Sequence, residues 1–168
     1  SAETGRAKLA LDEMEASVVC VHTRDGRLLQ QWRLPDARLS LRHLARHTSG
    51  VVGIALQAEH SEAERRQGAP VLALLDKFGL RTAEPAPALA GYGGDIIATP
   101  EGFVVSSPRG GGWGRWTVAG KWTGFTNLSE ACALASAGMG TFWAGGDVHA
   151  MAETAEAVIP RVNLPRLR

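Results

Sequence analysis

The sequence predicts an all-β fold, a β-propeller built from four-stranded antiparallel blades. Three observations lead to this prediction. Short apolar runs are rich in β-branched and aromatic residues, glycine-marked turns separate them, and one hairpin pattern recurs along the chain. A hairpin that repeats every 40 to 50 residues or so is typical of propeller blades, in which four strands are followed by a step to the next blade.

The clearest hairpin lies in residues 94–111, which read GDIIATPEGFVVSSPRGG. Two short strands are expected there, Ile96 to Thr99 and Phe103 to Ser106. The intervening Pro-Glu-Gly favours a turn, because proline presets φ and glycine accepts a positive φ. The same pattern of apolar run, glycine turn and second apolar run recurs in residues 42–56 and 132–145.

The turn glycines give the repeat its spacing. Gly50, Gly102 and Gly140 hold the same place in the three hairpins, at intervals of 52 and 38 residues with an average of 45. A β-sandwich also contains many short strands, but it does not require a hairpin to recur at this interval. We therefore favour propeller blades over a sandwich or barrel.

Strand pairs of a second kind lie between these inner hairpins. The first of them contains Asp25-Gly26, a dipeptide typical of tight hairpin turns. In chain order, the expected outer hairpins are residues 17–34, 71–83 and 115–125. The chain thus supplies three and a half to four blades, whereas a closed propeller typically has about four to eight. We predict a single propeller-like domain over residues 1–168, a fragment of a longer propeller.

Three other segments are assigned by composition. Residues 60–68 (HSEAERRQG) are polar and are expected to form an exposed loop or a single helical turn. Residues 84–90 are rich in Pro and Ala and are expected to form a surface connection. In residues 147–156 (DVHAMAETAE), helix competes with strand.

The composition excludes several functional classes. Hydrophobic residues make up 45% and charged residues 21% of the chain, and the net charge is +1, so no electrostatic footprint for nucleic acid is present. No apolar run approaches the roughly 20 residues of a transmembrane helix. The first residues contain no secretory signal, which indicates either a cytoplasmic protein or a chain that begins after a removed segment.

The two cysteines and the sequence motifs give no sign of a cofactor. Cys20 and Cys132 lie far apart without metal-ligand spacing, and we expect two buried thiols. No motif in the sequence requires a cofactor. Four tryptophans in the second half of the chain are expected to pack between blades rather than to stack a ligand; these are Trp113, Trp116, Trp122 and Trp143.

One set of candidate site residues follows from aligning the three inner hairpins on their turn glycines. The alignment places His43, Asp95 and Cys132 within one residue of a common position, where the chain enters the inner strand. Loops at one mouth of a propeller usually carry the ligand site. His43 and Cys132 are candidate metal ligands, and a Cys/His pair also supports nucleophilic chemistry. The alternative is that each residue closes a backbone hydrogen bond or packs in the channel wall.

A second set of candidates surrounds the SSPRGG sequence. Arg42 and Arg109 are candidates for holding an anionic ligand, and Gly110 would let a backbone N–H approach it. The alternative is that Arg109 pins a neighbouring blade while the glycines turn a corner. The segment is not a phosphate-binding loop, because it lacks the Lys-Ser/Thr ending and the following helix.

Three segments together resemble a known family. They are TGRAKLALDEMEAS at residues 4–17, LSLRHLA at 39–45 and SSPRGG at 106–111. In this order they resemble the uncharacterised bacterial family called domain of unknown function fifteen-thirteen. Its members are predicted β-propellers related to the quinoprotein amine dehydrogenase and YVTN propellers. The likeness covers most of the chain and corresponds to the later part of a family member.

The resemblance carries the functional expectations. Family members are exported and are often encoded beside imelysin-like proteins, which implies a periplasmic location and a role in iron acquisition. We expect a non-catalytic envelope propeller that acts as a binding or scaffolding module. The alternative is a metal-dependent or redox enzyme that uses His43, Cys132 and Asp95 at the channel mouth. Possible partners are a periplasmic protein and a second copy of the chain, because a partial propeller exposes open blade edges.

Overall fold

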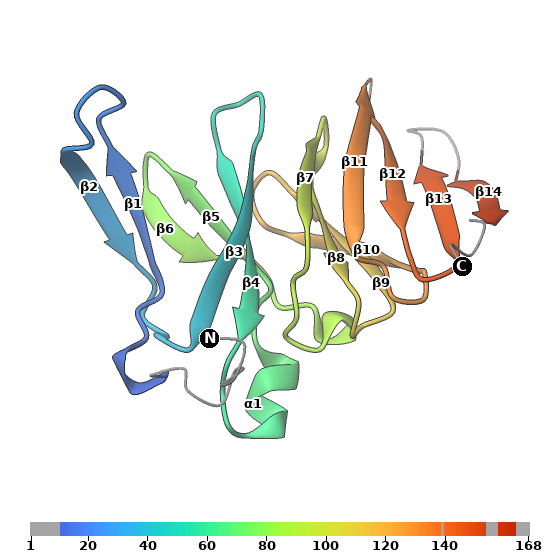
Figure 1. Cartoon of the computed structure of the whole chain (residues 1–168), viewed down its shortest axis with the longest axis horizontal. Coiled ribbons are helices and arrows are strands. Elements are labelled where there is room, and N and C mark those ends of the chain that lie inside the picture. The colour runs from blue at the N-terminus through green and yellow to red at the C-terminus, as the bar shows by residue number, and fades with distance from the viewer. Residues whose placement is uncertain (1–10, 139, 154–157, 164–168) are drawn as a thin grey trace.

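The chain folds into an arc of antiparallel sheets (Figure 1). The computed structural model describes residues 11–138, 140–153 and 158–163. A two-stranded sheet, here called the half-blade, is followed by three four-stranded sheets called blades 1, 2 and 3. The prediction of propeller blades is confirmed, and the described residues form three and a half of them.

Each blade is a meander in which consecutive strands pair. The half-blade contains β1 (Ser17–Val21) and β2 (Leu28–Arg33), and blade 1 contains β3 (Leu39–Arg46), β4 (Val52–Ala58), β5 (Leu72–Asp76) and β6 (Gly79–Thr82). Blade 2 contains β7 (Ile96–Thr99), β8 (Gly102–Ser107), β9 (Gly112–Thr117) and β10 (Trp122–Asn127). Blade 3 contains β11 (Ala133–Gly138), β12 (Thr141–Gly145), β13 (His149–Glu153) and β14 (Val158–Asn163).

The first strand of each complete blade lies on the inner side of the arc. β7 contacts both β3 and β11, and the three strands stand side by side in Figure 1. β2 contacts β6, the last strand of blade 1, so the half-blade corresponds to the outer part of a blade. The predicted alternation of inner and outer hairpins is therefore the arrangement observed.

The turn glycines have the backbone conformation on which the repeat prediction depends. Gly50, Gly102 and Gly140 have φ angles of 91°, 154° and 77°. At Gly102 the restriction is also steric, because a methyl group on its Cα would overlap the carbonyl oxygen of Trp116 on β9. Only glycine satisfies both conditions at this turn.

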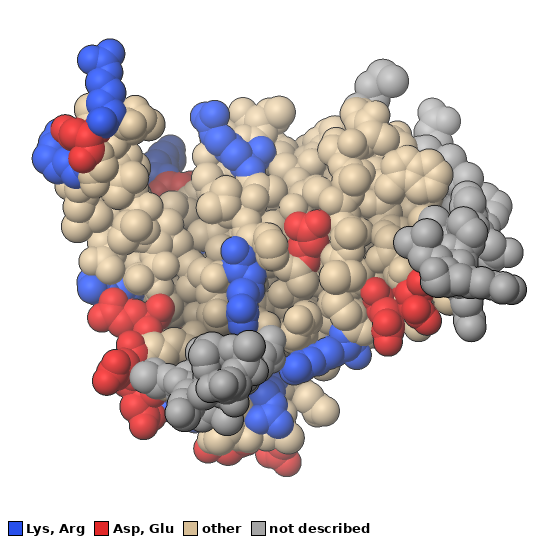
Figure 2. Space-filling model, in the orientation of Figure 1, with Lys and Arg blue, Asp and Glu red and all other residues tan. Residues whose placement is uncertain are grey.

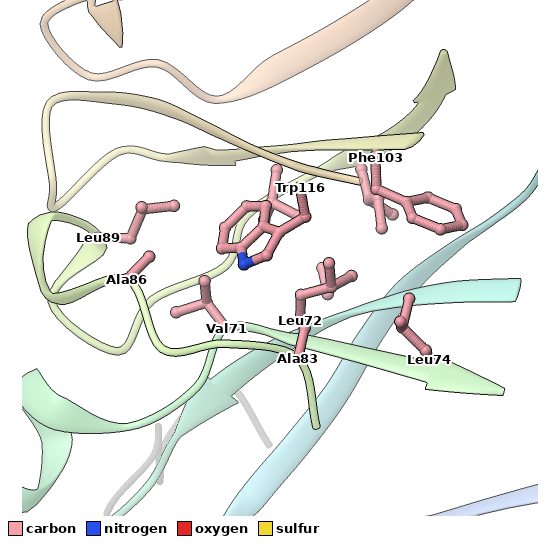
Figure 3. Close-up of a cluster of buried hydrophobic side chains, with 11 residues drawn as sticks. Val71, Leu72, Leu74, Ala83, Ala86, Leu89, Phe103 and Trp116 are labelled. Carbon is pink, nitrogen blue, oxygen red and sulfur yellow. The ribbon is translucent and has the colours of Figure 1, made fainter. Parts of the chain in front are cut away.

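Apolar side chains fill the spaces between the blades. In the space between blades 1 and 2, Trp116 packs with Leu72 and Phe103 (Figure 3). Trp113 is fully buried between blades 2 and 3, where its ring meets Phe142 edge to face. Trp113 and Trp116 therefore pack between blades as expected. Trp143 does not, because its side chain is 43% exposed.

The structure decides between two alternatives that the sequence leaves open. Residues 149–153, where helix competes with strand, form strand β13, because β13 pairs with β12 and buries Met151 between blades 2 and 3. The polar segment after His60 contains a short helix, α1 (Ala63–Gly68), and two 3-10 turns occur at η2 (Leu11–Glu13) and η3 (Pro87–Leu89).

Candidate functional site

A groove of about 510 Å³ lies where three blades meet on the inner side of the arc. It brings together four of the residues singled out by sequence, Arg42, His43, Asp95 and Cys132. The other lining residues are Gln57, Tyr92, Gly93, Gly94, Pro108 and Ala133. The centre of this face carries few charged side chains, and most of them gather at its lower edge and left end (Figure 2).

A bulge in β3 presents Arg42 and His43 to the groove. β3 and β4 pair at Leu41 with Leu56 and at Leu44 with Ile54. Two residues of β3, Arg42 and His43, therefore stand opposite the single residue Ala55. Bulges of this kind redirect side chains and are common beside active sites. The His43 side chain is exposed on the groove.

Arg42 is already paired with an acid. Its Nη2 donates to Oε1 of Glu59 at 2.9 Å, and the Glu59 side chain is only 16% exposed. The two charges largely offset each other at this wall of the groove. An anion bound by Arg42 would therefore compete with Glu59.

Asp95 acts as a latch between blades 2 and 3. Its Oδ1 accepts the N–H of Ile96 at 2.8 Å, and its Oδ2 accepts the N–H of Leu134 on β11 at 3.0 Å. Both carboxylate oxygens thus bind backbone donors. The sequence left two roles open for Asp95, a ligand site and closure of a backbone hydrogen bond. In the structure the carboxylate closes backbone hydrogen bonds.

Ser106 extends this latch. Its Oγ accepts the N–H of Asp95 at 2.9 Å and donates to the carbonyl oxygen of Cys132 at 2.6 Å. Ser106 is fully buried, so these bonds are protected from water. The serine of the SSPRGG sequence therefore joins the entry of β7 to the entry of β11.

Arg109 and Gly110 lie beside the groove rather than in its lining. The Arg109 guanidinium lies over the ring of Tyr92, 4.6 Å from its centroid, and Tyr92 lines the groove. The N–H of Gly110 donates to Oγ of Ser107 at 3.0 Å, and that hydroxyl donates to the carbonyl oxygen of Leu89. The N–H of Gly110 is therefore used in a hydrogen bond within this turn.

Gln57 is the groove residue that sequence reasoning missed. In β4, Ile54 and Leu56 face the half-blade core, so Gln57 shares the opposite face with Ala55, toward blade 2. The residue is 3% exposed and lines the groove, so the part of its side chain that remains accessible opens there. Its polar group is therefore available to a ligand or an ordered water.

A sequence signal for Gln57 exists. It is the one polar residue in the run VGIALQA of β4, all of whose other members are apolar or glycine. A polar residue at an expected core position is the pattern that binding sites produce.

The cysteines differ from the expectation of two buried thiols, which is wrong. Cys20 and Cys132 are both free and exposed. Cys20 lies on β1, near the tip of the half-blade hairpin. Cys132 precedes β11. Its backbone carbonyl takes part in the latch, and its side chain opens onto the groove.

The residues near the groove do not assemble a metal centre. Within the ranges that the structure describes, no group of three or more His, Cys, Asp or Glu side chains could hold a metal ion. His43 and Cys132, the two predicted ligands, share the groove with Asp95, but the three side chains do not form such a group. Likewise, within those ranges no helix is long and apolar enough to cross a membrane.

A family model and several solved structures match the chain. The model described as "Protein of unknown function (DUF1513)" matches residues 1–166. The chain is also similar to two structures of virginiamycin B lyase from Staphylococcus aureus, one selenomethionine-substituted and one of the catalytically inactive H270A variant with quinupristin, both with a TM-score of 0.66. Their identities to this chain are 15% and 16%, and each match covers 91% of this chain and 50% of the lyase.

A third similar structure is a protein of unknown function from Bacteroides caccae. Its TM-score is 0.55 and its identity 16%, with 84% of this chain and 52% of the other covered. This chain therefore spans about half the length of the solved chains it matches. No curated protein matches the sequence. At these identities the likeness establishes the fold, and the suspected family is confirmed by the family model.

The comparisons correct the functional expectation. The prediction of a non-catalytic scaffolding propeller linked to iron acquisition is wrong, because the similar structures include an enzyme and none of the comparisons connects this fold with iron. The predicted periplasmic location and self-association are not addressed by these matches and stay predictions.

Proposed function

The chain belongs to the DUF1513 family, and we propose that it forms part of a propeller enzyme that binds a small organic ligand in the inner groove, with His43 transferring a proton. The observation that carries the proposal is the pairing of two features in one groove. An exposed histidine stands on a strand bulge, and Gln57, the one polar side chain of an otherwise apolar strand, lines the same groove.

The other groove residues support assigning proton transfer to His43 and ligand binding to Gln57. Asp95 holds the blades together and Arg42 is paired with Glu59, so neither is free for proton transfer. Histidine is the side chain best suited to exchange protons near neutral pH. Gln57 can both donate and accept hydrogen bonds, which suits a ligand with an amide or carbonyl group. Tyr92, braced by Arg109, supplies an aromatic surface at the edge.

The similar structures suggest the first probe. Virginiamycin B lyase is an enzyme, and one of its structures, made inactive by replacing a histidine, contains quinupristin. We therefore test quinupristin, a ligand of that enzyme, on this chain. Binding is measured by isothermal titration calorimetry, and conversion is followed by mass spectrometry of the product.

Two variants separate binding from chemistry. Gln57→Leu keeps the size of the side chain and removes its hydrogen bonds, so we expect affinity to fall about 10- to 100-fold. His43→Ala should leave affinity within a few-fold and lower the turnover rate about 10²- to 10⁴-fold. His22→Ala is the matched control, since His22 bonds to Asp25 in the half-blade turn. Equal turnover by the His43 and His22 variants would contradict the proposed role of His43.

A further inference from the structure

A second cavity, of about 210 Å³, lies between blades 2 and 3. It is lined near the β7–β8, β9–β10 and β11–β12 turns, and its described lining residues all differ from those of the inner groove. Both of its walls belong to four-stranded blades, so its shape does not depend on the half-blade or on the outer face of blade 3. We call it the interblade cavity.

A charged residue stands in this cavity where the neighbouring junction has an apolar one. On the third strand of blade 1, Leu72 and Leu74 face blade 2 and are fully buried (Figure 3). On the third strand of blade 2, Trp113 faces blade 3 and is fully buried. Two residues later, Arg115 faces the same way, toward β13 of blade 3. Arg115 therefore holds the register position of a core leucine.

Arg115 forms a two-point ion pair across the junction. Its Nε donates to Oε1 of Glu153 at 2.7 Å, and its Nη2 donates to Oε2 of the same carboxylate. Its Nη1 donates to Oγ1 of Thr126 at 3.0 Å. The side chains of Arg115 and Glu153 are only 27% and 15% exposed.

Stability alone does not explain this pair. Removing two charges from water costs free energy that their attraction often only offsets, and apolar residues of similar volume are frequently as stable in such a place or more so. A polar residue at a core position is, by contrast, the pattern that binding sites produce. The pair also borders a cavity, so a ligand can reach it.

The lining offers hydrogen-bond donors and acceptors side by side. One further N–H remains on each of Nη1 and Nη2 of Arg115, and each carboxylate oxygen of Glu153 keeps a lone pair. Val104 and Phe142, which face each other from blades 2 and 3, supply an apolar part of the wall. Three threonine hydroxyls also line the cavity, those of Thr99, Thr117 and Thr123.

The charges and the size of the cavity indicate the class of ligand. Arg115 and Glu153 offset each other, and the other charged lining residue, Glu101, is exposed, where water and salt screen its charge. The volume lies below the roughly 300–1,000 Å³ of sites for drug-sized ligands. We propose that the interblade cavity binds a small neutral molecule with adjacent hydroxyl groups, a single monosaccharide ring. A hydroxyl both donates and accepts, so neighbouring hydroxyls bond to Arg115 and Glu153 together.

Saturation-transfer-difference NMR of the purified chain tests the proposal with four sugars, glucose, galactose, mannose and N-acetylglucosamine. We expect transfer to at least one of them and a dissociation constant in the millimolar range. The double variant Arg115→Leu/Glu153→Met removes both charges together. It should raise the dissociation constant roughly tenfold or more, because hydrogen bonds to charged groups are lost, and leave the unfolding temperature unchanged or higher.

A matched control removes an ion pair outside the cavity. Arg33→Leu/Glu15→Met replaces the exposed pair between Arg33 Nε and Glu15 Oε2, which are 3.0 Å apart, and should leave sugar binding unchanged. Circular dichroism shows whether each variant folds. If the Arg115/Glu153 double variant does not fold, Thr99→Val and Thr123→Val replace it, and at least one of them should weaken binding several-fold.

Three results would overturn the proposal. The first is the absence of binding to all four sugars. The second is unchanged affinity in the folded Arg115/Glu153 variant, or in both threonine variants, which would place the sugar elsewhere. The third is binding of propylammonium but of none of the sugars, which would show that Glu101 attracts a cation to the cavity.

Discussion

The groove depends on two residues, His43 and Gln57, that each depart from the regular pattern of their strand. His43 reaches the groove because β3 has one more residue than β4 at that point. Gln57 reaches it because strand alternation sends its side chain toward blade 2. In the described part of the chain, no side-chain hydrogen bond of either residue ties it to the surrounding strands. Asp95, by contrast, is fully accounted for by two backbone donors.

Single residues also determine how the stability of the fold depends on pH. In the β5–β6 turn, the Asp76 carboxylate accepts the N–H of Phe78 at 2.8 Å and pairs with Arg81. The hydrogen bond from Phe78, first, and the nearby Arg81 hold the pKa of Asp76 below its ordinary value of 3.8. A lowered folded-state pKa stabilises the fold above the unfolded-state pKa, and this contribution is lost as pH falls through the folded-state value.

We therefore predict that Asp76→Asn lowers stability at pH 7 and has a smaller effect near pH 3. The measurement is urea unfolding of both proteins from pH 7 to pH 3. Arg33, which pairs with the exposed Glu15, offers a control pair whose removal should matter little at either pH. A stability difference that grows as pH falls would contradict the prediction.

At the scale of elements, the sequence predicted strands better than it predicted the contacts between blades. The turn glycines and apolar runs are local signals, so the hairpins around Gly50, Gly102 and Gly140 could be placed from sequence. For residues 149–153 the sequence left helix and strand open, and pairing with β12 decides for strand over the preference of Ala and Met for helix. Propensity was a poor guide where a neighbouring strand supplied the partner.

Only part of the site could be predicted, because local signals place strands but do not show how the blades contact one another. Aligning the hairpins brought His43, Asp95 and Cys132 near one another because inner strands repeat at equal positions around the arc. The alignment could not show that Asp95 bonds to Leu134 of the next blade, since that contact depends on how the blades are spaced. Gln57 lies on the second strand of its blade, outside the aligned positions.

The latch between blades 2 and 3 yields a prediction at this scale. Asp95→Ala and Ser106→Ala each leave backbone groups of blade 3 without a partner, so each should lower the free energy of unfolding by about 1–3 kcal/mol. Because both side chains hold the entry of β11, Asp95 at Leu134 and Ser106 at Cys132, the double variant should lose less than the sum, by about 0.5–2 kcal/mol. Urea unfolding of the four proteins measures the cycle.

Ser136→Ala is the control for the latch, since its hydroxyl accepts the exposed N–H of Gly138 at 3.4 Å and has no other side-chain hydrogen bond among the described residues. It should change stability by less than about 0.5 kcal/mol, as surface substitutions do. Strictly additive effects of Asp95→Ala and Ser106→Ala would show that the two side chains act separately.

At the scale of the whole molecule, the inner side of the arc carries the groove, and the half-blade lies away from it. The two free thiols report on these regions separately. Cys132 lines the groove, whereas Cys20 lies on β1 of the half-blade, at the other side of the chain (Figure 1).

The central claim is that the inner groove is where the ligand binds, and protection of Cys132 from alkylation tests it most directly. Iodoacetamide labelling is followed at both cysteines by peptide mass spectrometry, with and without saturating quinupristin. We predict that the ligand slows labelling of Cys132 about tenfold, as expected when a bound molecule covers a pocket side chain, and leaves Cys20 unchanged. Calorimetric binding of quinupristin without protection of Cys132, or equal protection of both cysteines, would contradict the account.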